Sequence, residues 1–271
     1  MVTGIWGVLN VTPDSFSDGG LFLDSKAALA QAFKLVEAGA NVIDVGGEST
    51  RPGAERVSLE TELDRVIPII KELATAGVNV SVDTMRAEVA RSAVEVGAKI
   101  INDVSGGKAD SEMFSVVAAS DADYVLMHWR GHSDVMQQLV NYEDVTAEVI
   151  AEWQTQAALA EAAGIKSERI IFDPGIGFSK TAEQNWQLLQ NIGQFKNLPY
   201  RCLLGVSRKR FLADVISGST NADSAVTDRD LPTAVLSFYA AQNDLFAVRV
   251  HDVSSSAAAI RVASALGIGG F

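Results

Sequence analysis

Short apolar runs rich in valine and isoleucine alternate along the chain with longer stretches in which alanine, leucine and charged residues recur at helical spacing. Such runs are typical of strands buried on both faces, and such stretches are typical of amphipathic helices. The runs predict strands at residues 4–11, 41–47, 79–84, 99–105, 123–128, 169–175, 201–207 and 246–252. The stretches predict helices at residues 25–40, 59–77, 87–98, 145–164, 182–193, 229–242 and 254–267.

The order of these elements predicts the fold class. Several helical stretches stop at glycine, the usual signal for a helix C-terminus, as at Gly39, Gly77, Gly97 and Gly164. A strand recurs eight times within 271 residues, which is a suitable length for one α/β barrel. We therefore expect a single-domain (β/α)8 TIM barrel over residues 1–271, with an open doubly wound sheet as the alternative.

Polar side chains gather where the predicted strands end. They are Asn10, Asp44, Glu48, Asp83, Asn102, His128, Asp173, Ser207 to Lys209, Arg249 and His251. Because the carboxyl ends of barrel strands converge on one rim, these side chains are expected to face a common pocket. This ring favours the barrel over the open sheet.

Composition narrows the classes of partner. The net charge of −12 argues against a nucleic-acid partner, so any anionic ligand must be held by a few local cations. No segment approaches the length of apolar chain that a membrane span needs, and no basic region followed by an apolar run opens the sequence. These features predict a cytoplasmic protein with no membrane partner.

Cysteine and histidine are scarce. Cys202 is the single cysteine, so no internal disulfide can form, which agrees with a reducing compartment. Its apolar surroundings, CLLGV, predict a buried thiol rather than a nucleophile. With three histidines in all, no cluster resembles a zinc site, and His128 could equally be a satisfied rim residue or a ligand.

Three strand ends carry a carboxylate or an amide. Asp83, Asn102 and Asp173 close the runs SVDT, INDV and FDPG. A carboxylate suits a ligand edge with two adjacent N–H donors, and asparagine adds a donor beside an acceptor. Each could instead cap the helix that follows. Taken together, the three favour a ligand-binding role.

Cations follow the last two strands. Arg249 and His251 lie two residues apart in RVHD, so both are expected on one face of the strand, as an anion clamp or as half of an ion pair. The segment SRKRF places Lys209 after the seventh strand, where barrels often bind phosphate. Of its cations, we expect Lys209 to contact ligand.

Two polar, glycine-containing loops follow the first two strands. NVTPDSFSDGG covers residues 10–20, and GGESTRPGAER covers residues 46–56 with Arg51 at its centre. They could close over the pocket as lids, or they could be exposed connections, which composition does not distinguish.

Seven segments together resemble the signatures of dihydropteroate synthase, an enzyme family of folate synthesis. The segments are NVTPDSFSDGG, DVGGESTRPG, SVDT, NDVSGG, FDPGIGF, SRKRF and RVHD, in the family's order along nearly the whole chain. The resemblance implies that 6-hydroxymethyl-7,8-dihydropterin diphosphate condenses with p-aminobenzoate, giving 7,8-dihydropteroate and pyrophosphate. It also implies Mg²⁺ as the cofactor, a homodimer and a sulfonamide target.

The resemblance assigns roles to individual residues. The pterin edge would be read by Asp83, Asn102 and Asp173, with Lys209 on its acceptor side and Met127 and Phe178 as walls. The diphosphate would be held by Arg249, His251, Asn10 and Arg51, with Asn10 also the Mg²⁺ ligand, while Ser207, Thr50 and Pro52 would surround p-aminobenzoate. The catalytic residues would be Asp83, Asp173, Lys209 and Arg249.

One segment departs from the family pattern. After His128, WRGHSDVMQ lacks the proline of the commoner form, which puts in doubt any role for that loop. Two other functions share parts of the pattern: a pterin-binding methyltransferase, which would have no use for GGESTRPG, and a non-catalytic pterin-binding paralogue, in which the two lid motifs tend to be degraded. Both motifs are intact here.

Overall fold

The computed structural model of the protein describes residues 2–12, 20–48, 57–132, 135–217 and 225–267. The strands form a closed barrel in which each is parallel to its neighbours and β8 pairs with β1. They are β1 (Gly4–Asn10), β2 (Val42–Gly46), β3 (Val80–Asp83), β4 (Ile100–Asp103), β5 (Asp123–Met127), β6 (Ile170–Asp173), β7 (Arg201–Leu204) and β8 (Ala247–Val250). The closed barrel confirms the predicted (β/α)8 fold and excludes the open sheet.

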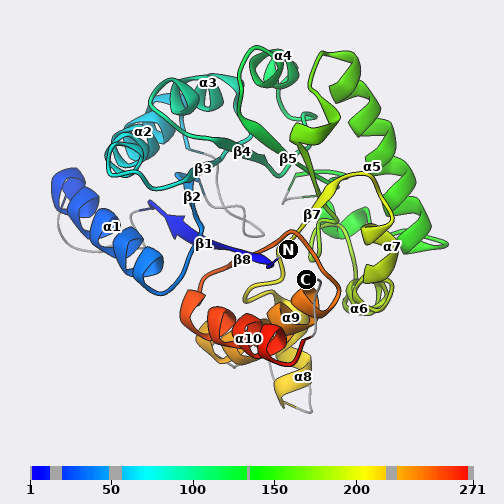
Figure 1. The fold of residues 1–271 in the computed structure, drawn as a ribbon. Coiled ribbons are helices and arrows are strands. Elements are labelled where there is room, and N and C mark those ends of the chain that lie inside the picture. Colours follow the sequence, from blue (N-terminus) through cyan, green and yellow to red (C-terminus); the bar gives the residue numbers. More distant parts are fainter. Residues whose placement is uncertain (1, 13–19, 49–56, 133–134, 218–224, 268–271) are drawn as a thin grey trace.

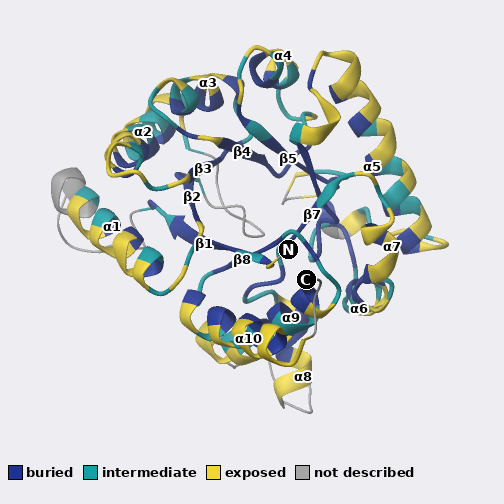
Figure 2. Cartoon of the chain, in the orientation of Figure 1, coloured by how far each residue is buried: buried dark blue, intermediate teal, exposed yellow. Residues whose placement is uncertain are grey.

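Helices form a ring outside the strands (Figure 1). The α-helices are α1 (Gly20–Glu37), α2 (Leu59–Thr75), α3 (Ala87–Glu95), α4 (Met113–Ala118), α5 (Val145–Ala162), α6 (Ala182–Gln190), α7 (Ile192–Lys196), α8 (Ala213–Ser217), α9 (Asp230–Gln242) and α10 (Val253–Ala265). Short 3₁₀ helices are η2 (Met136–Gln138), η3 (Ser167–Arg169), η4 (Arg210–Leu212) and η5 (Val226–Arg229). Figure 2 shows their exposed residues on the side away from the barrel.

The predicted helices match observed ones, with local differences. The stretch predicted at 182–193 divides into α6 and α7, because Asn191 leaves helical geometry between them. The short helices α4 and α8 were not predicted, since six and five residues are too few to show a helical period. All four predicted terminating glycines have positive φ, from 79° to 116°.

The interior of the barrel is apolar near the amino ends of the strands. One cluster joins seven strands there and consists of Trp6, Val42, Ile100, Val125, Ile171, Leu203 and Ala247. Side chains two residues apart on a strand share a face, so the residue two places after each member also points into the barrel. Asn102, Met127, Asp173 and Arg249 stand in that position. The strand register therefore directs these four predicted site residues inward above an apolar floor.

A larger cluster packs the outer faces of the strands against the helices, and Cys202 belongs to it. The thiol is buried, as predicted, and burial raises its pKa well above the ordinary value. Among the described residues, no helix combines the length and the apolar character that a membrane span requires.

Candidate active site

The carboxyl rim of the barrel carries most of the predicted site residues. Asn10, Asp83, Met127 and Asp173 are the last residues of their strands, and Asn102 and Arg249 are the last but one. Ser207, Lys209, Phe178 and His251 lie in the segments that follow β7, β6 and β8. Thr50, Arg51 and Pro52 lie outside the described residues, as does most of each predicted lid.

Arg249 joins two buried carboxylates at the barrel axis. Its Nε donates to Oδ2 of Asp44 at 2.5 Å and its Nη2 donates to Oδ2 of Asp83 at 2.7 Å. Asn102 Nδ2 donates to the same Asp44 oxygen at 3.0 Å. The arginine side chain is 21% exposed and its partners are buried, so the pair is not a surface ion pair. Asp44 was placed on the predicted rim but not among the site residues.

Burial and charge compete in this cluster. Burial raises the pKa of Asp83 to about 7, helped by the charge of Asp44 and opposed by that of Arg249. For Arg249, burial alone would lower the pKa, but Asp44 and Asp83 outweigh it and hold the pKa above its usual value. Arg249 therefore stays cationic, and Asp83 can change its protonation state near neutral pH.

Asp173 is buried and Lys209 is partly buried, and the opposite charges of the two side chains influence each other. Burial raises the pKa of Asp173, and the charge of Lys209 is the largest effect that opposes it. Burial lowers the pKa of Lys209 to about 8, and Asp173 opposes that shift. The Lys209 ammonium lies 4.7 Å from the centroid of the Phe178 ring and donates to the carbonyl of Ile176.

An apolar wall stands beside these charges. Met127 packs with Val104 and Trp129 in a small buried cluster, and Phe178 and Met85 lie against it. Met127 and Phe178 were both assigned to a ring-binding slot from the sequence, and the structure brings them together. A flat heteroaromatic ring that has polar edges fits such a setting, because its faces meet apolar atoms while its edges meet the buried Asp173 carboxylate.

Ser207 and His251 meet across the last two strands. The Ser207 hydroxyl lies 2.9 Å from Nδ1 of His251, and it accepts the backbone N–H of His251 at 3.1 Å. His251 follows the end of β8, so β8 carries Arg249 while the loop after it carries His251. The two predicted anion-binding residues thus lie on one segment with different partners.

Arg86 ties together the two ends of the segment that contains the second predicted lid. It donates to Oε2 of Glu48 at 3.0 Å and to the carbonyl of Val57 at 2.5 Å. The same guanidinium pairs with the buried carboxylate of Glu62, which also accepts the Thr84 hydroxyl at 2.6 Å. The described ends of that segment are therefore fixed to α2 and to the start of α3.

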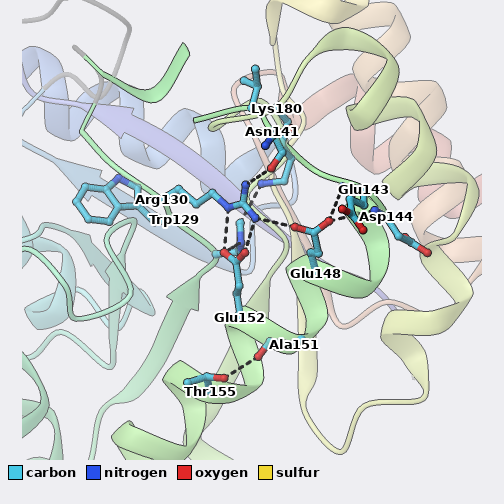
Figure 3. A network of polar contacts seen from close by, with 12 residues as sticks. Trp129, Arg130, Asn141, Glu143, Asp144, Glu148, Ala151, Glu152, Thr155 and Lys180 are labelled. Atoms are coloured by element: carbon cyan, nitrogen blue, oxygen red, sulfur yellow. Dashed lines mark hydrogen bonds and ion pairs between the residues drawn. The ribbon is translucent and has the colours of Figure 1, made fainter. Parts of the chain in front are cut away.

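A charged network lies beside the rim, between β5, α5 and the loop after β6. Nε2 of His128 lies 3.0 Å from Oε2 of Glu152, and the same carboxylate pairs with Arg130 (Figure 3). Nδ1 of His128 lies 3.1 Å from the ammonium of Lys180, which the sequence analysis did not single out. His128 is thus a satisfied buried residue, one of the two alternatives left open.

The protein ligands for a divalent cation are few. No group of three or more His, Cys, Asp or Glu residues that could hold a metal ion occurs in the described part of the chain. Mg²⁺ needs no such group, because it keeps several waters and binds through one or two protein oxygens together with phosphate oxygens. The amide of Asn10, partly exposed at the end of β1, supplies an oxygen of this kind.

Comparisons with known proteins agree with this site. Residues 6–251 match the family described as pterin binding enzyme. The dihydropteroate synthase of Mycobacterium leprae is 46% identical over 260 residues, which cover 96% of this chain and 92% of that protein.

Solved structures give the same result. The Xanthomonas albilineans dihydropteroate synthase with 4-aminobenzoic acid has a TM-score of 0.90 and 38% identity, covering 99% of this chain and 94% of that one. The dihydropteroate synthase from Anaplasma phagocytophilum with bound 6-hydroxymethylpterin-monophosphate has a TM-score of 0.88 and 39% identity, covering 98% of this chain and 100% of that one. The chain therefore belongs to the pterin binding enzyme family, among the dihydropteroate synthases.

Proposed function

We propose that the protein condenses 6-hydroxymethyl-7,8-dihydropterin diphosphate with p-aminobenzoate to give 7,8-dihydropteroate and pyrophosphate. The observation that carries the proposal is the buried Asp173 carboxylate together with the partly buried Lys209 ammonium, which lies over the Phe178 ring at the apolar wall. Relatives with bound 4-aminobenzoic acid and bound 6-hydroxymethylpterin-monophosphate support it.

The pterin is assigned to the inner part of the site. The carboxylates of Asp83 and Asp173 would accept N–H groups of the amino-pyrimidine edge, and Asn102 would supply a donor and an acceptor. Lys209 would donate to a ring acceptor. The Lys209 ammonium already lies over the Phe178 ring. The space between these two side chains and the apolar wall would therefore admit only a flat ring.

The diphosphate is assigned to the outer cations. Nε and Nη2 of Arg249 bond Asp44 and Asp83, which fixes the plane of the guanidinium. Nη1 would then donate to a diphosphate oxygen, with His251 and Arg51 as further donors. Mg²⁺, held by Asn10 and the diphosphate, would supply positive charge that stabilises the leaving pyrophosphate.

The reaction exchanges one bond for another at the pterin methylene carbon. Its C–O bond to the diphosphate breaks, and both electrons leave with pyrophosphate. The p-aminobenzoate nitrogen forms the new C–N bond and then loses one proton to solvent. Arg249 acts where negative charge develops on the leaving oxygen, so its contribution is greatest in the transition state. Ser207, Thr50 and Pro52 would orient the p-aminobenzoate ring.

Calorimetry with 6-hydroxymethylpterin tests the pterin assignment. Asp173→Asn should weaken binding by about 10-fold or more, because a charge-assisted pair of hydrogen bonds is lost. Asp123→Asn is the matched control, since Asp123 lies at the opposite end of β5 and pairs there with Arg201. Equal affinities of wild type and Asp173→Asn would refute the assignment.

We also propose a cytoplasmic homodimer. The single buried cysteine suits a reducing compartment. Exposed apolar side chains on the adjacent helices α9 and α10, and on the residue that follows α10, would form the contact between subunits, namely Leu231, Val235, Val262 and Leu266. Sedimentation equilibrium should show that Val235→Glu with Val262→Glu dissociates the dimer and that Leu159→Glu on α5 does not. A monomeric wild type would contradict this proposal.

A further inference from the structure

Lys180 is buried at a position where lysine is rarely found. It follows the glycine-rich loop after β6 and precedes α6, and the residue is 4% exposed. Its ammonium has three partners: the carbonyls of Gly175 and Phe178, each at 3.0 Å, and Nδ1 of His128 at 3.1 Å. An ammonium has three N–H donors, so all of them are used.

The partners fix the state of His128. Because Nδ1 accepts from Lys180, Nε2 carries the hydrogen and donates to Glu152 at 3.0 Å. Burial, followed by the charge of Lys180, lowers the pKa of His128 to about 3, so the ring stays neutral. The result is a chain of contacts from the Lys180 ammonium through a neutral imidazole to the Glu152 carboxylate.

Arg130 completes this chain on the far side. Its Nε donates to Oε2 of Glu152 at 3.0 Å, its Nη2 donates to Glu148 at 3.1 Å, and its guanidinium lies 3.6 Å from the centroid of the Tyr142 ring. Figure 3 shows Arg130 between the two glutamates. Hydrogen bonds from His128 and from Arg130 hold the pKa of Glu152 well below its usual range. Glu152 therefore remains an anion and faces the Lys180 amino group through His128, although burial lowers the pKa of Lys180 to about 7.

The other contacts of Lys180 fall on the loop that carries two proposed pterin-binding groups. The N–H of Gly175 donates to Oδ1 of Asp173 at 2.7 Å, while the carbonyl of Gly175 accepts from Lys180. One glycine thus links the carboxylate to the ammonium. The carbonyl of Phe178 is held by the same ammonium, which fixes the backbone of the residue whose ring lies against the apolar wall.

The packing around Gly175 leaves this loop little freedom. A Cβ at Gly175 would lie 2.2 Å from the carbonyl oxygen of His128, and the residue has φ +64°. The backbone after Asp173 therefore lies directly on the end of β5. A small shift of Lys180 would move Gly175 and, through its N–H, the Asp173 carboxylate.

We propose that Lys180 is a positioning residue for pterin recognition: its ammonium holds the Asp173–Phe178 loop in the binding geometry, and the His128–Glu152–Arg130 chain holds the ammonium. This inference rests on the proposed function. Lys180 acts on Asp173 and Phe178 and makes no contact with substrate. Its role is therefore confined to the pterin side of the site, away from Arg249.

Two probes separate positioning from general structural support. Isothermal calorimetry would measure the affinity of 6-hydroxymethylpterin, which tests the inner slot, and of pyrophosphate with Mg²⁺, which tests the outer cations. Lys180→Met should weaken pterin binding by about 10-fold or more, the usual effect of losing hydrogen bonds to a charged group. It should leave pyrophosphate binding within about 2-fold. Lys166→Met, at an exposed lysine, should change neither.

Glu152→Gln supplies a second variant. The Glu152 side chain is 35% exposed, so we expect the fold to tolerate this substitution even if Lys180→Met does not fold. It keeps an acceptor for His128 but removes the charge, and it should weaken pterin binding by about 3-fold with pyrophosphate binding unchanged. In the double variant the two effects should not multiply, because both act through one chain of contacts.

The outcomes separate this inference from the proposed function. If the wild type does not bind the pterin, the proposed function fails and this inference falls with it. If the wild type binds the pterin and both variants bind it with the affinity of the wild type, only the inference fails. Equal weakening of pterin and pyrophosphate would also overturn it, because that result marks a loss of general structural support.

Discussion

Nη2 of Arg249 donates to Oδ2 of Asp83 at 2.7 Å, across the barrel from β8 to β3. The sequence assigns one of these residues to a diphosphate and the other to a pterin edge. Their direct contact means that the two halves of the proposed site share one hydrogen-bonded cluster. A substitution of Arg249 or of Asp83 should therefore alter the environment of the other residue.

Removing Arg249 should cost stability as well as function. Arg249→Ala leaves the buried carboxylates of Asp44 and Asp83 without their cation, which costs about 3–5 kcal/mol for a broken buried pair. The loss should be smaller at pH 5 than at pH 8, since Asp83, whose pKa is raised to about 7, is then protonated. Urea denaturation at the two pH values measures it.

Arg91→Ala is the matched control. Arg91 pairs with Glu88 at 3.6 Å on the surface of α3, where both side chains are more than half exposed. Its loss should change the free energy of unfolding by about 0.5 kcal/mol or less. Similar losses for the two variants would show that the Arg249 cluster is not buried as described.

Asp83 should give the stability curve a recognisable pH dependence. Its pKa is raised from 3.8 to about 7 mainly by burial, so the stability it contributes is present at low pH and is lost as the pH rises through about 7. Asp83→Asn removes this titration. The free energy of unfolding of the variant, relative to that of the wild type, should rise by about 2–4 kcal/mol between pH 4 and pH 7, with little further change above pH 7.

Lys180 and Lys209 titrate in a different window. Burial lowers their pKa values to about 7 and about 8. Their titration therefore raises the free energy of unfolding as the pH increases from those values to the ordinary lysine pKa. A difference between wild type and Asp83→Asn that does not vary between pH 4 and 7 would mean that the pKa of Asp83 is not raised. Chemical denaturation at closely spaced pH values decides this.

Gly177 should not tolerate a side chain. Its φ is +81°, and a Cβ would lie 2.8 Å from Cδ of Lys209. Gly177→Ala should destabilise the fold by about 1–3 kcal/mol and weaken pterin binding by displacing Lys209. Gly193→Ala, in α7 with no atom within 4 Å of the new Cβ, should be neutral or stabilising by up to about 1 kcal/mol. Thermal unfolding that ranks the two alike would contradict this account.

Metal removal should act on the outer part of the site. Chelation of Mg²⁺ should weaken pyrophosphate binding by about 10-fold or more and leave 6-hydroxymethylpterin binding unchanged, because the cation binds mainly through phosphate oxygens. Asn10→Ala should reproduce part of this effect, and the exposed Asn197→Ala should not. Pyrophosphate affinity that does not depend on Mg²⁺ would exclude the proposed cofactor.

The sequence predicts the barrel and the rim because both depend on local patterns. Each strand is marked by an apolar run, and the rim residues lie at or near the end of their runs, as Asp83 and Asp173 do. Asp44 is harder to assign because its importance comes from two distant partners, Arg249 and Asn102, which meet only in the closed barrel.

Lys180 gives no local signal at all. A lysine between a glycine-rich loop and a helix is ordinarily exposed. Its burial depends on His128, which directly follows β5, and on the tight approach of Gly175 to the His128 carbonyl. Local sequence patterns do not report contacts between distant segments. Residues that position a site through such contacts, without binding the ligand themselves, are therefore not predicted from the sequence.

Pyrophosphate release tests the central claim most directly. Purified protein would be mixed with 6-hydroxymethyl-7,8-dihydropterin diphosphate and Mg²⁺, with and without p-aminobenzoate. We predict release that depends on p-aminobenzoate, matches 7,8-dihydropteroate in amount and falls in Lys209→Ala. Tight binding of the pterin diphosphate without release would contradict the synthase and would identify a pterin-binding protein that lacks the chemistry.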